Sequence, residues 1–453
     1  MTTAREESSE SVGLNSYLIR SALIAALGGL LFGFDTAVIS GATRALSATY
    51  LLSPGMLGFT VSSALWGTVL GSLFAGYPSD RYGRRAALRA LAVFYVVSAA
   101  GCALAWNWYA LVAFRVVGGL AIGGSSVIGP MYIAEIAPAA KRGRLVALFQ
   151  FNVVLGILLA YFSNYLVGLG SFGAAEWRWK LGVAAAPAIL FFFALFSIAE
   201  SPRWLVRRGF QAEAREVLAR AGERDADRQI QEILSSVTSE QTQHGERLFQ
   251  RRYSLPIFLA ISIGMFNQLA GINAILYYLN DIFERAGFSK VSSDLQAVAI
   301  GLTNLVFTVI AMSLIDRLGR KKLLLVGACG TGACLAGVAL VFFTGRRQGA
   351  LLWLLVTYIA FFAFSQGSVI WVYLSEVFPN LVRAKGQSLG SFTHWFMNAL
   401  ISGVFPLMAA SSGGLPFAFF ALMMVAQFFV VWLLYPETRG IPLERMEQEI
   451  GRH

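Results

Sequence analysis

The sequence predicts an all-α polytopic membrane protein with about twelve transmembrane helices. First, 57% of the 453 residues are hydrophobic and only 13% are charged, whereas soluble domains carry about 25% charged residues. The mean hydropathy is accordingly high, at +0.63. Second, apolar runs of about 20 residues, the length that crosses a bilayer, recur along the whole chain. Third, several motifs of the first half recur in the same order in the second half.

Hydropathy predicts six spans in each half of the chain. Those of the first half cover residues 17–41, 55–77, 86–106, 109–133, 145–168 and 180–199. Those of the second half cover residues 254–283, 295–315, 321–344, 350–374, 385–410 and 415–435. Basic residues concentrate in alternate loops, while the loop Trp106-Asn107-Trp108 has no charge. The positive-inside rule therefore predicts that both termini are cytoplasmic.

The polar segments outside the spans define the expected domain organisation. Residues 1–16 and 436–453 form cytoplasmic tails, and the polar start predicts no signal peptide. Residues 200–253 form the one long polar segment, and Gln211–Leu218 within it has helical apolar spacing with charged faces. We therefore expect short cytoplasmic helices that link a first bundle, 17–199, to a second bundle, 254–435.

Composition and motifs exclude several classes of function. The net charge of +11 arises from basic residues between apolar runs, which indicates membrane topology and not nucleic-acid binding. The three cysteines, Cys102, Cys329 and Cys334, lie in apolar runs, which argues against structural disulfides and a zinc site. No Gly-x-x-x-x-Gly-Lys-Ser/Thr loop is present. We expect no metal, no cofactor and no enzymatic activity.

An internal repeat relates the two halves of the chain. Asp80-Arg81-Tyr82-Gly83-Arg84-Arg85 recurs 236 residues later as Asp316-Arg317-Leu318-Gly319-Arg320-Lys321. Glu135-Ile136-Ala137-Pro138 followed by Arg142 recurs 241 residues later as Glu376-Val377-Phe378-Pro379 followed by Arg383. A looser repeat relates Glu200-Ser201-Pro202-Arg203 to Glu437-Thr438-Arg439. Because each half has an even number of spans, the halves are parallel repeats about an axis along the membrane normal.

One acidic residue, Asp35, lies within the glycine-rich first span, where a charge needs a partner or a proton. Arg115 of the fourth span is the candidate partner. At a rise of about 1.5 Å per residue, Asp35 lies about 25 Å along its span and Arg115 about 9 Å from the opposite face. In a hydrocarbon core about 30 Å thick, the two residues therefore lie at similar depth, in the outer part of the membrane. An ion pair between them is therefore predicted.

The motifs from Asp35 to Gly440 resemble those of the sugar porter family of the major facilitator superfamily, and in particular its proton-coupled bacterial monosaccharide symporters. The resemblance implies two six-helix bundles in a parallel pseudo-two-fold repeat that rock about a central sugar site. In this family an acid at the position of Asp35 marks the proton-coupled members. The resemblance thus implies that Asp35 and Arg115 are the proton-coupling pair, and that proton binding releases Arg115.

The seventh span carries Asn267-Gln268-Leu269-Ala270-Gly271-Ile272-Asn273 and then Tyr277-Tyr278, similar to the family signature Gln-Gln-x-x-Gly-Ile-Asn…Tyr-Tyr. Amides offer paired donors and acceptors to sugars, and aromatic rings stack on them. Straight-helix spacing does not align Gln268, Asn273 and Tyr278 on one stripe, so a break at Gly271 is expected. The implied sugar contacts are Gln150, Gln268, Asn273, Tyr278, Asn304, Trp371, His394 and Trp395, with Asn267 and Phe32 as further candidates.

Three positions depart from the family pattern. Asn267 replaces the first glutamine of the signature, which shortens its reach by one methylene. Gly367-Ser368 stands where the family has Gly-Pro, so the helix is expected to bend differently there. His394 stands where relatives carry an amide, and a histidine is able to bond a sugar or to titrate near neutral pH.

The acidic and basic residues of the repeated motifs are expected to act as cytoplasmic latches, because membrane topology requires only the basic ones. Charge-assisted bonds between helix ends would hold the cytoplasmic side closed and would break when the halves rock. The expected gating residues are Asp80, Arg81, Arg84, Glu135, Arg142, Glu200, Arg203, Asp316, Arg317, Glu376 and Arg383.

The sequence thus favours proton-coupled import of a hexose or pentose by a monomeric, multi-pass protein of the bacterial inner membrane. Its expected partners are the sugar, the proton and the lipid bilayer, and no nucleic acid. A facilitative sugar uniporter of the same fold would lack the coupling that Asp35 suggests. A drug or organic-cation antiporter of the same superfamily is the other alternative, although cation sites prefer carboxylates and aromatic cages.

Overall fold

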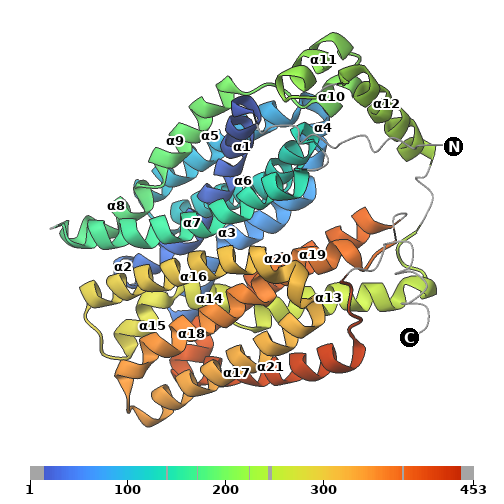
Figure 1. Cartoon of the computed structure of the whole chain (residues 1–453). Coiled ribbons are helices and arrows are strands. Elements are labelled where there is room, and N and C mark those ends of the chain that lie inside the picture. The colour runs from blue at the N-terminus through green and yellow to red at the C-terminus, as the bar shows by residue number, and fades with distance from the viewer. Residues whose placement is uncertain are drawn as a thin grey trace.

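The computed structural model describes residues 15–138, 141–170, 172–223, 225–242, 247–379 and 382–439, without the side chains of 237–242 and of Asp316. Within these residues the regular elements are all helices, as the sequence predicts. They form two groups that lie against each other, the first coloured blue to green and the second yellow to red in Figure 1. The predicted tails lie mostly outside the described residues.

The first half contains the spans that hydropathy predicts, together with short helices at the bundle ends. Its helices are α1 (Ser16–Val38), α2 (Thr43–Tyr50), α3 (Pro54–Phe74), α4 (Gly76–Tyr82), α5 (Arg84–Ala103), α6 (Trp108–Ile136), α7 (Arg142–Gly168), α8 (Glu176–Gly182) and α9 (Ala185–Ala194). The segment between the halves forms α10 (Pro202–Arg207), α11 (Gln211–Arg220) and α12 (Ala226–Thr242). These are the short linking helices that the sequence predicts.

The second half repeats this pattern with more interrupted spans. Its helices are α13 (Ser254–Leu269), α14 (Ile272–Tyr277), α15 (Leu279–Arg285), α16 (Lys290–Leu318), α17 (Arg320–Thr344), α18 (Leu351–Phe364), α19 (Gln366–Glu376), α20 (Arg383–Ser411) and α21 (Leu415–Leu434).

Eleven helical stretches of the described residues are long and apolar enough to cross a membrane. The one predicted span that is not among these eleven, 385–410, is the 29-residue helix α20. Polar residues lower its hydropathy, and two of them, His394 and Asn398, are buried in the protein. A helix that packs against other helices and a polar cavity tolerates such residues better than a helix that faces lipid.

Two spans of the second half are broken near the middle of the protein. Gly271 separates α13 from α14 with φ of +83°, a left-handed conformation that glycine adopts readily. A Cβ on Gly271 would also lie 2.3 Å from the Phe420 ring. The predicted break at Gly271 is therefore present. The second break is at Ser365, between α18 and α19, two residues before the Gly367-Ser368 pair.

The two ends of the bundles differ in what they carry, as Figure 1 shows. The end that we call terminal, on the right of the view, carries the linking helices α10–α12. The distal end, on the left, carries α2, α8 and α15. These two names are used below.

Candidate functional site

A cavity of about 110 Å³ lies between the two halves. Helices α1 and α7 of the first half line it, and so do α13, α14, α16, α18, α19 and α20 of the second half. Eight of the ten side chains expected to contact sugar line this cavity: Phe32, Gln150, Asn267, Asn273, Asn304, Trp371, His394 and Trp395. The wall therefore combines amides with aromatic rings, and no carboxylate lines it among the described residues.

Gln268 lies behind the cavity wall and is buried, with 2% of its surface exposed. Its Oε1 accepts a hydrogen bond from Asn273 Nδ2 at 2.9 Å, and its Nε2 lies 3.2 Å from His394 Nδ1. The same Nε2 donates to Asn267 Oδ1 at 3.0 Å. In this conformation Gln268 therefore positions three lining side chains. The break at Gly271 makes this possible, because it brings Asn273 back toward Gln268 five residues earlier.

Aromatic contacts set the other walls of the cavity. Phe32 of α1 and Trp395 of α20 meet across the two halves, with ring centroids 5.3 Å apart at 61°. Trp371 lies 5.1 Å from the His394 ring and is 39% exposed. A tryptophan with a free face beside several amides is suited to stack on a sugar ring.

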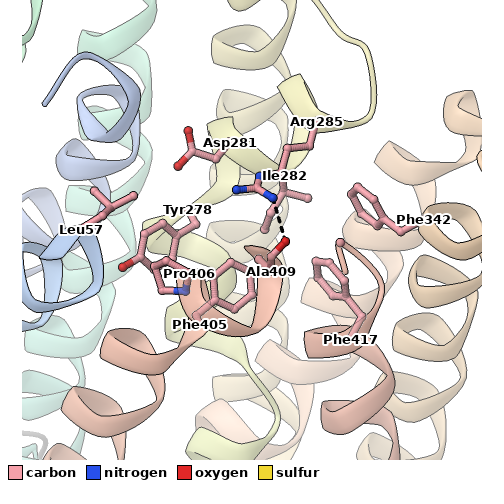
Figure 2. Close-up of a pocket in the computed structure, with 11 residues that line it drawn as sticks. Leu57, Tyr278, Asp281, Ile282, Arg285, Phe342, Phe405, Pro406, Ala409 and Phe417 are labelled. Carbon is pink, nitrogen blue, oxygen red and sulfur yellow. Dashed lines mark hydrogen bonds between the residues drawn. The ribbon is translucent and has the colours of Figure 1, made fainter. Parts of the chain in front are cut away.

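Tyr278 does not line this cavity. Its ring stacks on Phe405 with centroids 5.0 Å apart, and its hydroxyl donates to the Ser402 carbonyl at 3.0 Å. Figure 2 shows Tyr278 in a separate small pocket that Asp281 and Arg285 also line. Its side chain therefore lies outside the cavity in this conformation, and its contact with sugar stays a prediction. Tyr278 lies between α14 and α15, and its ring packs against Phe405 of α20, a long-range contact that family-motif spacing does not reveal.

The structure brings Asp35 and Arg115 together. Arg115 Nη1 lies 3.3 Å from both carboxylate oxygens of Asp35, and Nη2 donates to the Val61 carbonyl at 3.4 Å. The Arg115 side chain is buried at 3% exposure, whereas Asp35 is 21% exposed. Arg115 Nε has no hydrogen-bond partner among the described residues. The pair thus joins α1 to α6 through long bonds, with the acid more accessible than the base.

At the terminal end of the first half, Arg84 forms the centre of a buried charge cluster. Its Nε and Nη2 donate to the two oxygens of Glu135 at 3.0 Å each, and its Nη1 donates to Asp80 at 3.0 Å. Glu200 accepts the backbone N–H of Arg84 at 2.8 Å. Bidentate arginine–carboxylate bonds of this kind are strong and directional.

The second half repeats this cluster around Arg320. Its Nε and Nη2 donate to the two oxygens of Glu376 at 3.1 and 2.8 Å. Glu437 accepts the backbone N–H of Arg320 at 2.8 Å, and the Thr438 hydroxyl donates to Glu376 at 2.6 Å. Ser201 makes the matching bond to Glu135 in the first half. The internal repeat is therefore also a repeat of side-chain contacts.

The clusters differ from the expected latches in two respects. First, Arg142, one of the expected gating residues, begins α7 and is not part of the cluster, in which Glu135 pairs with Arg84. Second, each cluster joins helices within one half, so it does not by itself tie the halves together. The sequence motifs run along one chain segment, whereas the partner of each glutamate comes from a helix that packs beside it. A role in closing the cytoplasmic side stays a prediction.

The remaining expected gating residues have other surroundings. Arg81 donates to the Tyr77 hydroxyl at 2.9 Å, and Arg383 donates to the Phe378 carbonyl at 3.2 Å. The Arg317 carbonyl accepts from Arg439 at 2.5 Å. Arg203 lies in α10. The Asp316 side chain lies outside the described part of the structure.

Sequence reasoning missed four members of these clusters: Ser201, Arg320, Glu437 and Thr438. Arg320 was missed because topology alone accounts for a basic residue in that loop. The repeat contained the necessary signal, since Arg320 follows Arg84 by the same 236 residues that separate the two motifs. Thr36 and Thr308 also line the cavity without having been expected there.

Replacing Gly83 with alanine should destabilise the first half. Gly83 has φ of +101°, and a Cβ there would lie 2.3 Å from a Glu200 oxygen. Backbone strain alone costs about 1–3 kcal/mol, and Glu200 must also leave the start of α5. We expect a lower melting temperature of the detergent-solubilised protein. Gly76→Ala is the control, because nothing lies within 4 Å of a Cβ at Gly76. Equal melting temperatures for the two variants would contradict the prediction.

At the distal end, five hydrogen bonds and ion pairs between described residues join the two halves. They connect Ser40 with Asn280, Arg44 with Glu284, Tyr161 with the Leu276 carbonyl, Glu176 with Lys290, and Lys180 with Asp294. Helices α3 and α20 also cross closely there, since a Cβ on Gly58 would lie 1.9 Å from the Gly403 carbonyl oxygen. The halves are thus held together on the distal side of the cavity.

Comparisons with known proteins agree with this architecture. A family model described as "Sugar (and other) transporter" matches residues 21–450. The D-xylose-proton symporter of Escherichia coli strain K12 is 35% identical over 474 residues, covering 96% of each chain. The arabinose-proton symporter of Bacillus subtilis strain 168 is 36% identical over 439 residues, covering 95% of each chain.

Solved structures of the xylose transporter XylE from E. coli are similar to this fold. An inward open conformation matches with a TM-score of 0.85 and 34% identity, covering 96% of this chain and all of the other. A partially occluded inward open conformation also matches at 0.85, with 35% identity, covering 94% of this chain and 100% of the other. The XylE structure bound to 6-bromo-6-deoxy-D-glucose matches at 0.78, with 35% identity, covering 96% of this chain and 100% of the other.

Proposed function

The chain belongs to the sugar transporter family, the sugar porters of the major facilitator superfamily, and from that premise we propose that it is a proton-coupled symporter of a monosaccharide. The observation that carries the proposal is the Asp35–Arg115 pair, which joins α1 to α6 in a protein whose cavity is lined by amides and tryptophans. The relatives named above are symporters of xylose and arabinose with protons. A hexose or pentose is accordingly the proposed substrate.

Proton coupling follows from the charge balance at this pair. While Asp35 is ionised, it neutralises the buried guanidinium of Arg115 and ties α1 to α6. A proton on Asp35 removes that attraction and leaves Arg115 to bond the Val61 carbonyl on α3. The helices of the first half then change their mutual contacts. The partial exposure of Asp35 gives the proton access to the carboxylate without unfolding the site.

Sugar binding follows from the cavity wall. Asn273, Asn304 and Gln150 offer both donors and acceptors to hydroxyl groups, and Trp371 offers a ring face. The short helices α14 and α19 beside the breaks carry Asn273 and Trp371. A bound sugar would therefore contact the two segments that these breaks separate from the rest of their spans. This arrangement suits alternating access about a central site.

The basic residues of alternate loops support an assignment of each segment relative to the membrane. We assign residues 1–16 and 436–453 to cytoplasmic tails, 17–199 and 254–435 to the two bundles, and 200–253 to a cytoplasmic linker. The terminal end then faces the cytoplasm and the distal end faces outward. The protein would function as a monomer in a bacterial inner membrane. The higher similarity to inward open structures supports a conformation closed on the outer side.

The test is uptake of radiolabelled sugars by proteoliposomes under an imposed inward proton gradient. D-xylose, L-arabinose and D-glucose form the panel, and an organic cation serves as the comparison. We expect at least one monosaccharide to accumulate above its outside concentration, and a protonophore to abolish the accumulation. Equilibration without accumulation would instead indicate a uniporter. Exchange of the organic cation for protons would indicate an antiporter.

A further inference from the structure

A chain of bonded side chains at the distal end passes back and forth between the two halves. Lys180 of α8 donates to Glu176 at 2.9 Å and, across the interface, to Asp294 of α16 at 3.3 Å. Asp294 also accepts from Asn280, whose side-chain oxygen accepts from Ser40 of the first half at 2.9 Å. With Lys290, which bonds Glu176, these residues form the distal network: Ser40, Glu176, Lys180, Asn280, Lys290 and Asp294.

The central pair of this network is deeply buried. Lys180 and Asp294 each expose 1% of their surface, although one belongs to the first half and the other to the second. Burying a charge costs several kcal/mol unless a partner compensates it. Asp294 therefore keeps this charged partner only while the two halves are together at this end, whereas Lys180 also has Glu176 in its own half. Lys290, at the rim, has a side chain that is 53% exposed.

Two glycines of the first half leave room for the two members of the pair. A Cβ on Gly41 would lie 3.1 Å from Cδ of Lys180, so the glycine leaves room for the lysine stem. A Cβ on Gly168 would lie 2.8 Å from Oδ2 of Asp294, so a second glycine leaves room for the incoming carboxylate. These contacts indicate a specific interface between the halves and not an incidental surface ion pair.

We propose that the Lys180–Asp294 pair is a charge latch of the distal end: each buried charge is neutralised by the other only while that end is closed, and the halves separate there only when both charges become hydrated. A cavity of about 540 Å³ borders the pair and is lined by Arg44, Asp281 and Glu284 in addition to the network residues. This cavity therefore gives the two charges an adjacent polar space in which water can hydrate them once they separate. The latch acts on the conformational step itself, at a site separate from the Asp35–Arg115 pair and from the amide cavity.

The experiment measures the distance between the halves at the distal end. Spin labels are placed at Leu51→Cys, which is 87% exposed in the wild type, and at Arg346→Cys, which is exposed beyond α17. Cys102, Cys329 and Cys334 are replaced by alanine in this background. Distance distributions are recorded in proteoliposomes without sugar and without a proton gradient. The result therefore does not depend on whether the chain is a symporter.

Lys180→Met leaves the Asp294 carboxylate buried without its partner. We expect the ratio of distally open to closed molecules to rise about tenfold or more, because removing one member of a buried pair strands the other charge. The double variant Lys180→Met with Asp294→Leu should return to the closed distribution, because it strands no charge. It should also take up sugar more slowly than the wild type, since opening no longer gains the hydration of two charges.

Lys290→Met is the matched control, because it removes an exposed lysine of the same network. Its distribution should change less than about twofold, as exposed ion pairs contribute little. Lys180→Arg should keep the closed distribution. The proposal is overturned if Lys180→Met leaves the distances unchanged. It is equally overturned if the double variant opens as far as the single one, because lost packing would then account for both.

Discussion

Replacing Asp35 with asparagine should abolish proton-driven accumulation of sugar while sugar exchange continues. Asparagine has the size of aspartate but takes up no proton, so the Arg115 contact no longer depends on pH. For one proton per sugar, a gradient of one pH unit supports about tenfold accumulation, since a pH unit corresponds to about 1.4 kcal/mol. The variant should therefore reach only the outside concentration. Uptake and sugar-driven pH change in proteoliposomes give the measurement.

Two further variants make this result specific. Glu232→Gln removes an acid of α12 whose side chain is 60% exposed, and it should leave accumulation unchanged. Asp35→Asn combined with Arg115→Gln removes the stranded guanidinium, so it separates a loss of coupling from a loss of folding. Coupled accumulation that survives in Asp35→Asn would refute the assignment of this pair, whereas exchange lost in both variants would point to a structural role.

Replacing Asn273 with alanine should weaken sugar binding about 10- to 100-fold, because a hydrogen bond to a buried polar group contributes about 1–3 kcal/mol when its partner is removed. Asn273 lines the cavity, and its Nδ2 is already bonded to Gln268. Its remaining donor and its oxygen are thus available to a hydroxyl group. The variant also leaves Gln268 Oε1 without that bond. The measurement is the KM of uptake together with a direct binding titration.

Asn152→Ala provides the matched control. Asn152 is an asparagine of α7 with 6% exposure, and its Nδ2 donates to the Leu148 carbonyl within its own helix at 2.9 Å. It does not line the cavity, so its KM should remain within about twofold of the wild type, as expected of a site outside the contact set. The number of protons carried per sugar should be unchanged in Asn273→Ala. Equal KM values for the two variants would remove Asn273 from the proposed site.

The sequence by itself determined the helical class, the spans and the internal repeat. It also determined the partner of Asp35, because helix rise and bilayer thickness leave few charged groups at one depth. Arg115 meets that condition, and the structure places it 3.3 Å from the carboxylate. The break at Gly271 followed from a local conflict between residue spacing and helical geometry. These features depend on one segment or on the membrane, so they can be read from the chain.

Tertiary structure alone decided which side chains share a wall and which charges pair. Tyr278 lies outside the expected cavity because its ring packs against Phe405 of α20. Glu135 of α6 accepts hydrogen bonds from Arg84 of α5, because these two helices lie side by side. Lys180 and Asp294 are 114 residues apart and belong to no repeated motif. Contacts of this kind depend on how two bundles meet, and no spacing within the sequence carries that information.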